Sequence, residues 1–273
     1  MPELAEVEFF RRRWHEAAVG RTVTDVRVHA AKKTFRHVPA PEIQAGLHRQ
    51  HYMGSAARAK QMVFRFGADR WLGIHLGMTG ELLVSPGLPG AHDHLVLVLD
   101  EEITLVFRDP RMFGGVRWHQ GADEPAWWSE IAPSLLSPAF DRATLAEFLT
   151  RRARAPIKAV LLMQERFPGI GNWMADEILW RAGIHPARLA GSLSDAERRA
   201  LYRETRRVCR LALEKIAGVG SELPPDLNVN IPDSWLFNHR WEAGGRCPRT
   251  GALLVREEIG GRTTCWSPGR QSL

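Results

Sequence analysis

The sequence predicts an α+β protein whose first half is one helix followed by a β-sandwich or barrel, and whose second half is helical. Three observations carry this prediction. Apolar residues recur at helical spacing in 2–19, short apolar runs separated by turn residues fill 22–119, and helix start and stop signals follow one another in 141–217. A chain of 273 residues is long enough for about two domains and a sizeable core.

The first helix is predicted over residues 2–19. Leu4, Val7 and Trp14 recur at roughly helical spacing, and Gly20 follows as a helix terminator. The stretch 22–119 is then dominated by strand patterns. A first apolar run spans 23–28. Two pairs of apolar runs follow, each pair separated by a short polar turn: 62–66 with 71–76, and 94–99 with 103–107.

Glycine and prolines between 121 and 138 predict a linker, which we place at 126–140. It would join an N-terminal domain, 1–125, to a helical domain, 141–230. The last segment, 231–273, contains a hairpin pattern centred on Gly260-Gly261.

Capping residues define the helices of the second half. Asp141 is a suitable N-cap, Gly183 is a suitable terminator, and Ser194 with Glu197 forms a capping box that opens a long helix ending near Ile216.

Composition limits the partners and the compartment. The formal net charge of +6 favours a polyanion such as nucleic acid. No apolar run approaches the roughly 18 residues of a membrane helix, and the charged N-terminus does not resemble a secretory signal. Three cysteines do not form a disulfide framework, so we expect a reducing cytoplasm. We also expect a monomer.

The first residues offer an unusual nucleophile. If Met1 is removed, the α-nitrogen of Pro2 becomes a free secondary amine, and an α-amino group titrates near pH 8, about two units below lysine. Such an amine can attack an electrophilic sugar carbon and form an iminium. Glu3 is tethered beside it and can move protons. The alternative is ordinary helix initiation, for which a proline followed by acidic residues is typical.

Two stretches resemble the Fpg/Nei family of DNA glycosylases. The start, Met-Pro-Glu-Leu-Ala-Glu-Val-Glu, differs from the usual start of the family only at Ala5. Residues 168–186 resemble the helix–two-turn–helix signature of that family. Two glycines before a helix suit a phosphate, although most such turns are structural. The resemblance implies that Asn172 binds the DNA backbone.

Further positions take their roles from the same resemblance. Lys60 resembles the strand-borne lysine of the family, which contacts phosphate and assists elimination; a solvated lysine is the alternative. Met78, Arg111 and Phe113 would fill the space left by an everted nucleotide, whereas core packing is the alternative for the Met and the Phe. His92 matches a DNA-contact histidine, although His92-Asp93-His94 is also a metal-pair pattern. Phosphate contacts are expected at Lys158, Arg154 and Arg152.

The C-terminal segment departs from the family, which usually ends in a four-cysteine zinc finger. The four ligand positions fall on Cys247, Thr250, Ser267 and Arg270. A structural zinc site needs four thiolate or imidazole ligands, so we predict no zinc and a zincless-finger hairpin. A Cys247–Cys265 disulfide is disfavoured in a reducing compartment. Arg262 matches the finger arginine that grips phosphates.

The resemblance implies a bifunctional DNA glycosylase/AP lyase of base excision repair, with an N-terminal helix and β-sandwich domain and a helix–two-turn–helix domain. Its substrate would be double-stranded DNA with formamidopyrimidines, 8-oxoguanine or abasic sites. Pro2 would act as nucleophile through β,δ-elimination, and no metal or organic cofactor is required. The alternative is a non-catalytic damaged-DNA-binding protein that retains the fold, although a pure binder has no need of an N-terminal secondary amine.

Overall fold

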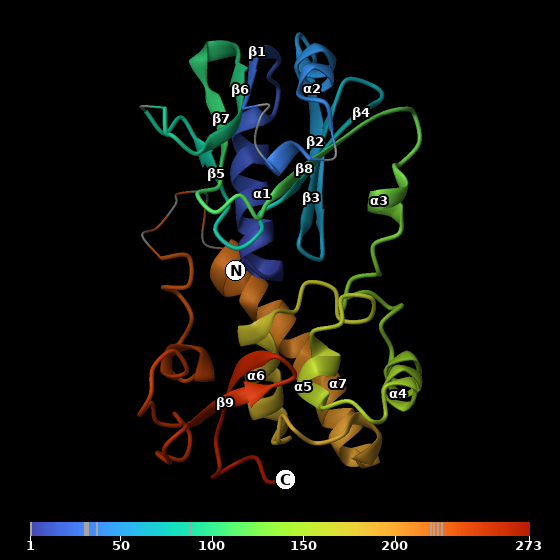
Figure 1. The fold of residues 1–273 in the computed structure, drawn as a ribbon, viewed down its shortest axis with the longest axis vertical. Helices are drawn as coiled ribbons and strands as arrows, with labels where there is room; N and C mark the ends of the chain where they lie inside the picture. The colour runs from blue at the N-terminus through green and yellow to red at the C-terminus, as the bar shows by residue number, and fades with distance from the viewer. Residues whose placement is uncertain are drawn as a thin grey trace. The chain divides into compact units, whose positions relative to one another are not determined.

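The computed structural model describes residues 2–29, 33–36, 38–87, 89–218, 220, 222, 224 and 226–273. The chain forms two compact units (Figure 1). The first contains Met1–Ile131 with Gly220–Leu223, and the second contains Ala132–Val219 with Pro224–Leu273. No helix in these described ranges is both long and apolar enough to cross a bilayer.

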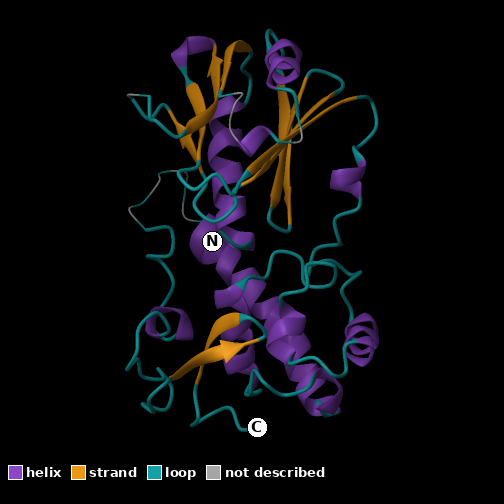
Figure 2. Ribbon diagram, viewed as in Figure 1, coloured by secondary structure: helices purple, strands orange, loops and turns teal. Residues whose placement is uncertain are grey.

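The first unit is built around helix α1 (Leu4–Ala18), which packs against two antiparallel sheets (Figure 2). Trp14 is fully buried and shows why the helix is held there. Its indole N–H donates to the carbonyl oxygen of Leu83 at 3.0 Å, and its ring lies 5.0 Å from that of Phe64. Leu83 and Phe64 belong to different sheets, so one side chain links the helix to both.

Each sheet has four strands. The first has the order β1 (Val23–Val28), β6 (Asp93–Leu99), β7 (Thr104–Arg108) and β5 (Glu81–Val84). The second has the order β2 (Tyr52–Arg58), β3 (Gln61–Phe66), β4 (Arg70–His75) and β8 (Gly115–Gln120). The two predicted hairpins are confirmed as β3–β4 and β6–β7, and the sandwich prediction is confirmed as well.

Several short elements lie where the sequence predicted strands or a linker. Helix α2 (Ala40–Leu47) falls inside the region predicted as β; Pro39 caps it, and Ile43 and Leu47 bury one face. Two single turns, η1 (Lys33–Phe35) and η2 (Asp100–Glu102), lie in the same region. Helix α3 (Ala126–Ser129) opens the predicted linker.

The buried ring of Trp128 in α3 packs with Val63 and Trp71 of the second sheet. The first part of the predicted linker is therefore packed on the first unit.

The second unit is helical with one hairpin. Its elements are α4 (Arg142–Arg151), α5 (Ile157–Leu161), α6 (Asn172–Ala182), η3 (Ala190–Ser192), α7 (Asp195–Ala212), η4 (Leu213–Ala217), η5 (Leu236–His239), β9 (Val255–Ile259) and β10 (Arg262–Trp266).

The predicted caps of these helices are confirmed. The Asp141 carboxylate accepts from the Thr144 N–H at 2.7 Å, Gly183 is left-handed with φ 72°, and Ser194 forms the capping box with Glu197.

Replacing Trp14 with Phe tests the central position of α1. The variant loses the indole hydrogen bond and leaves the Leu83 carbonyl without that donor, so we expect a loss of about 2 kcal/mol in the free energy of unfolding. Met53→Ala, at a side chain 59% exposed, is the control and should change it by less than about 0.5 kcal/mol. Urea unfolding measures both, and equal effects would contradict the central role of Trp14.

Candidate functional site

Pro2 and Glu3 stand directly before α1. Glu3 is extended (φ −105°, ψ −167°), and its N–H donates to the Glu6 carboxylate at 3.1 Å, which fixes the first turn. Pro2 is half-buried, whereas only 2% of Glu3 is exposed. The structure thus holds a buried carboxylate at the residue that follows the proline.

Lys60 lies in the two-residue turn between β2 and β3, because Arg58 pairs with Gln61 and Ala59 has φ +57°. The expectation of a strand-borne lysine is therefore wrong in detail. The Lys60 side chain is half-buried at this end of the hairpin.

Helix α1 runs antiparallel beside β2, so the N-terminal end of the helix lies at the same height as the β2–β3 turn. His15 Nδ1 lies 2.8 Å from the Tyr52 hydroxyl, and Arg11 donates to Ser55 Oγ at 2.9 Å. From Arg11 back to Glu3 the helix spans about 12 Å, and from Ser55 onward to the turn the strand spans about 13 Å. Figure 1 shows the N-terminal end of α1 at the same end of the first unit as the β2–β3 turn.

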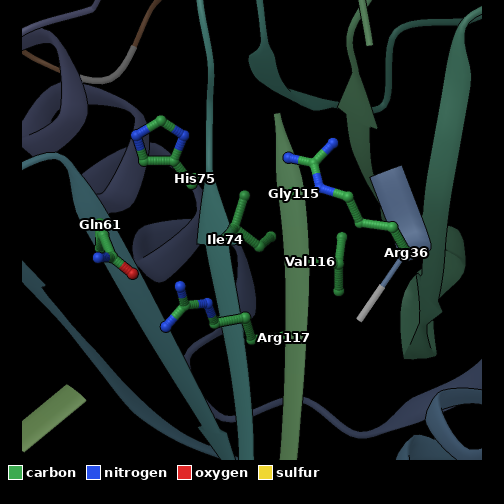
Figure 3. A pocket seen from close by; sticks show the side chains of 8 residues that line it. Arg36, Gln61, Ile74, His75, Gly115, Val116 and Arg117 are labelled. Carbon is green, nitrogen blue, oxygen red and sulfur yellow. The ribbon is translucent and has the colours of Figure 1, made fainter. Parts of the chain in front are cut away.

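A row of paired residues continues from Lys60 across the second sheet. Gln61 pairs with His75, and His75 pairs with Gly115. These residues line a cavity of about 270 Å³ together with Arg36 and Arg117 (Figure 3). The cavity has three nitrogen-rich side chains on its walls and lies directly beside the lysine turn.

The surroundings of His75 in this cavity disfavour its charged form. Burial lowers its pKa, and the positive charges of Lys60, Arg117 and Arg36 lower it further. The Gly77 N–H donates to Nδ1 at 3.1 Å, so the neutral ring carries its proton on Nε2. An uncharged donor beside three cations suits an anionic oxygen such as that of a phosphate.

No role was predicted from the sequence for Arg36, His75 or Arg117. Strand alternation could have indicated that His75 and Arg117 share one face of the sheet. This inference requires the register of β4 and β8, which the sequence does not give. Arg36 reaches the cavity from a separate turn after η1, which no sequence pattern indicates.

The two loops after β4 and β7 are tied together by Asp109, which is fully buried. Its carboxylate accepts from the Thr79 hydroxyl at 2.9 Å, from the Arg111 N–H at 3.2 Å and from the Gly114 N–H at 2.7 Å. At Gly77 (φ +65°) a Cβ would lie only 2.4 Å from the backbone of the other loop, so this close approach requires glycine.

The side chains at the loop tips are exposed. Met78 is 41% exposed and Phe113 is 50% exposed, so the core-packing alternative is wrong for both. The exposed Arg111 lies over the Phe113 ring at 4.9 Å. The structure therefore brings the three predicted residues onto neighbouring loops as two apolar side chains and one cation.

His92 and His94 do not form a metal pair. His92 is exposed, whereas His94 is buried with Nε2 2.8 Å from the Asp109 carbonyl oxygen. In the described part of the chain, no three His, Cys, Asp or Glu side chains cluster as metal ligands. His92 remains available for a surface contact.

In the second unit, Asn172 occupies the first turn of α6 after Gly171. Its amide nitrogen donates to the Thr263 carbonyl oxygen of β10 at 2.8 Å, which leaves a second amide proton for another acceptor. The exposed Arg154 lies before α5, and Arg152 pairs with Glu165 at 2.6 Å.

Lys158 is not a surface cation, and the prediction of a phosphate contact is corrected. Its side chain is fully buried and forms an ion pair with Asp176, whose carboxylate also binds Arg240 at 2.5 Å. Lys158 Nζ donates to the Asn172 carbonyl oxygen at 2.8 Å. The physical reason is the buried carboxylate on α6, which needs compensating charge. Lys158 thus positions Asn172.

The hairpin that carries Arg262 is joined to the same network. The Cys265 N–H donates to Asp176 Oδ2 at 3.0 Å. Gly260 and Gly261 have φ +62° and +74°, as a tight two-residue hairpin turn requires. Arg262 begins β10 and is exposed.

The four finger positions do not fit zinc. Trp180 Nε1 donates to Cys247 Sγ at 3.3 Å. Burial alone would raise the pKa of Cys247, but hydrogen bonds from Ser267, Thr250 and Trp180 lower it to about 6. A guanidinium stands at the last position: Arg270 donates to the Trp180 carbonyl oxygen at 3.2 Å. One thiol, two hydroxyls and a cation are not a zinc ligand set.

The other cysteine is no replacement ligand. Burial raises the pKa of Cys265 to about 12, and the Asp176 charge adds to this effect. Cys209, Cys247 and Cys265 are all free thiols.

Comparisons with known proteins cover both units. Residues 1–116 match the model of the formamidopyrimidine-DNA glycosylase N-terminal domain, and 131–222 match the model of the formamidopyrimidine-DNA glycosylase H2TH domain. A formamidopyrimidine-DNA glycosylase of Mycolicibacterium gilvum is 36% identical over 98% of this chain and 97% of its own length. One from Laribacter hongkongensis is 35% identical over 99% of this chain and 100% of its own.

Solved structures agree with these matches. A crystal structure of Lactococcus lactis Fpg (MutM) with DNA containing N7-benzyl-Fapy-dG has a TM-score of 0.86 and 26% identity, with 100% of each chain covered. A structure of MutM with DNA containing carbocyclic 8-oxo-G has a TM-score of 0.84 and 25% identity, again covering 100% of each chain.

Replacing Lys158 with Met separates the buried lysine from a surface cation. Asp176 would lose one of its two buried cationic partners, so we expect a loss of about 3 kcal/mol in the free energy of unfolding. The control is Arg154→Met at an exposed side chain, with an expected change below about 0.5 kcal/mol. Denaturant unfolding measures both, and a small loss for Lys158→Met would contradict the positioning role.

Elemental analysis of purified protein tests the finger. We expect far less than one zinc per chain, because only Cys247 among the four positions is a thiol. Prolonged treatment with a chelator should leave the unfolding transition unchanged. A stoichiometric zinc content would contradict both the ligand argument and the prediction.

Proposed function

Because the chain belongs to the formamidopyrimidine-DNA glycosylase family, and is thus a DNA glycosylase of base excision repair, we propose that it is bifunctional and also cleaves abasic DNA as a lyase. The observation that carries the proposal is the Pro2–Glu3 start of α1, level with the Lys60 turn and its cation-lined cavity. A binding protein has no need of this arrangement.

The chemistry proceeds through Pro2 once Met1 is removed. The secondary amine attacks the anomeric carbon of the damaged nucleotide, the bond to the base breaks, and the base leaves with a proton. Glu3 supplies the proton for ring opening or base departure. The resulting iminium acidifies the neighbouring carbon, so β-elimination and then δ-elimination break the strand on both sides. The amine is itself the electron sink, so no metal or organic cofactor is needed.

The remaining site residues hold the DNA. Lys60 and the neutral His75 bind phosphate oxygens on the first unit, and Lys60 assists proton transfer. On the second unit, Asn172, Arg154 and Arg262 bind the backbone, and Arg262 assists the second elimination. His92 adds a backbone contact.

Met78 and Phe113 insert where the damaged nucleotide is everted, which offsets the cost of unstacking. Arg111 donates to the orphaned base opposite. The substrate is double-stranded DNA with damaged bases or abasic sites.

Formamidopyrimidines are the lesions we expect to be released well, and 8-oxoguanine less well. The Met78, Arg111 and Phe113 set supports the first part. The stretch 218–234 is rich in glycine, proline and asparagine and does not resemble the usual lesion-capping loop of the 8-oxoguanine enzymes, which supports the second part. Residues 219, 221, 223 and 225 in it lie outside the described residues. Release of thymine glycol without formamidopyrimidine would contradict this preference.

Borohydride trapping on a duplex with an abasic site tests the nucleophile. Wild type should form a covalent adduct, and Pro2→Gly should lose nearly all of it. Glu3→Gln should lower base release by about 10²-fold or more, yet keep more trapping on the abasic duplex, where no base has to leave. Glu8→Gln, on the same helix, is the control.

If no adduct forms although Met1 is absent by mass spectrometry and DNA binding is intact, the protein is a non-catalytic damage binder.

A further inference from the structure

Helix α7 presents a row of exposed arginines. The row consists of Arg199, Arg203, Arg207 and Arg210, all exposed. Their spacing of four, four and three residues places them on one face of the helix. Leu201, Val208 and Ala212 are buried on the helix, which packs against α6 and α4. The arginine row is therefore turned to solvent and is separate from the DNA-binding residues proposed above.

A cup lies at the start of this row. It encloses about 310 Å³ and is lined from α4 by Arg142, Ala143, Leu145 and Ala146, and from the start of α7 by Asp195, Arg198 and Arg199. The α4 side supplies aliphatic carbon, whereas the rim is cationic. Since Arg199 belongs to both the cup and the arginine row, the two features are continuous.

The cup keeps excess positive charge. Arg198 Nε donates to the Leu193 carbonyl oxygen at 3.0 Å, so its guanidinium is already oriented. The side chains of Arg142 and Arg199 make no hydrogen bond or ion pair with any residue that the structure describes. Asp195 is the one acidic residue that lines the cup among those described. Three cations therefore face one carboxylate.

Positive charge also exceeds negative charge along the arginine row. Arg203 pairs with Glu204 at 2.9 Å, but 65% of its side chain is exposed. The side chains of Arg207 and Arg210 have no hydrogen-bond or ion-pair partner within the described ranges of the chain. Glu204 itself is buried, and the other acidic residues stand near the ends of the helix, at Asp195 and Glu197 and, just beyond it, at Glu214. The middle of the exposed face is left cationic.

We propose that the cup and the arginine row form a docking site for an acidic peptide segment of a partner protein. One apolar side chain of the segment fills the cup, and its carboxylates lie along the row. Successive arginines four residues apart are separated by about 6 Å along the helix. Alternate residues of an extended peptide are about 6.6 Å apart. A segment with acidic residues at alternate positions therefore matches the row.

The composition of the cup favours a peptide over a single-stranded nucleic acid. Single-stranded nucleic acid binds to basic surfaces through aromatic side chains on which its bases stack. No aromatic residue lines the cup among the residues described. An aliphatic floor beneath guanidinium groups is complementary to an apolar side chain next to carboxylates.

Fluorescence anisotropy with labelled nine-residue peptides tests the proposal. One peptide carries Phe at its N-terminus and another at its C-terminus, and both have Glu at alternate positions. At least one should bind wild type with a Kd of about 10 µM. Replacing its Phe with Ser should weaken binding, and so should Ala146→Gln, which reduces the space in the cup.

Matched charge variants isolate the row. The variant R199Q/R203Q/R207Q should bind the peptide about tenfold more weakly. The control R27Q/R49Q/K215Q removes the same three positive charges from exposed positions elsewhere and should bind normally. Trapping on a short abasic duplex should be unchanged in both, so failure of trapping in wild type would bear only on the lyase proposal.

Three outcomes would overturn the docking proposal. In the first, neither peptide binds the wild type. In the second, the two triple variants bind the peptide equally weakly, which would indicate that only the overall charge of the protein matters. In the third, a single-stranded oligonucleotide displaces the peptide and its own binding depends on the arginine row. That result would assign the surface to nucleic acid.

Discussion

The buried carboxylate of Asp176 is the interaction on which the second unit depends. It is held on α6 by Lys158 from α5 and by Arg240, and it accepts from the backbone of β10 at Cys265. A buried carboxylate is costly unless it is paired and fully hydrogen-bonded. Every partner that satisfies it belongs to a different segment, so satisfying the charge also fixes where those segments lie.

The first unit uses the same physical solution. Asp109 is also fully buried, and its carboxylate joins the loop at Thr79 to the loop that ends at Gly114. In both units the aspartate is itself buried. It fixes the backbone next to the exposed Met78 and Phe113 in one unit, and next to the half-buried Asn172 and the exposed Arg262 in the other. Preorganised backbone of this kind reduces the entropy that ordering on binding would cost.

Much of this could be predicted from the sequence because it rests on local chemistry. The caps at Asp141 and Ser194, the glycine turn at 260–261 and the paired strands are encoded within a few residues. The features that the sequence did not predict correctly depend on residues far away in the chain. Lys158 looks like a surface cation in sequence, since its partner Asp176 is 18 residues away. The cavity at His75 needs the register of three strands and a separate turn, and α2 is too short for periodicity to outweigh its surroundings.

Side-chain contacts hold the β9–β10 hairpin, where the sequence predicts a zincless finger, to helix α6. A zinc ion would tie distant residues together through four bonds. Here Trp180 of α6 supplies part of that connection, because its indole N–H binds Cys247, and Arg249 and Arg270 lie over its ring at 4.6 and 5.2 Å. Cation–π contacts and hydrogen bonds are individually weaker than a zinc–thiolate bond. The hairpin is also anchored through Asp176 and Asn172, however. A metal is therefore not needed as the sole link between the hairpin and α6, and without one Arg262 stays attached to the helix that carries Asn172.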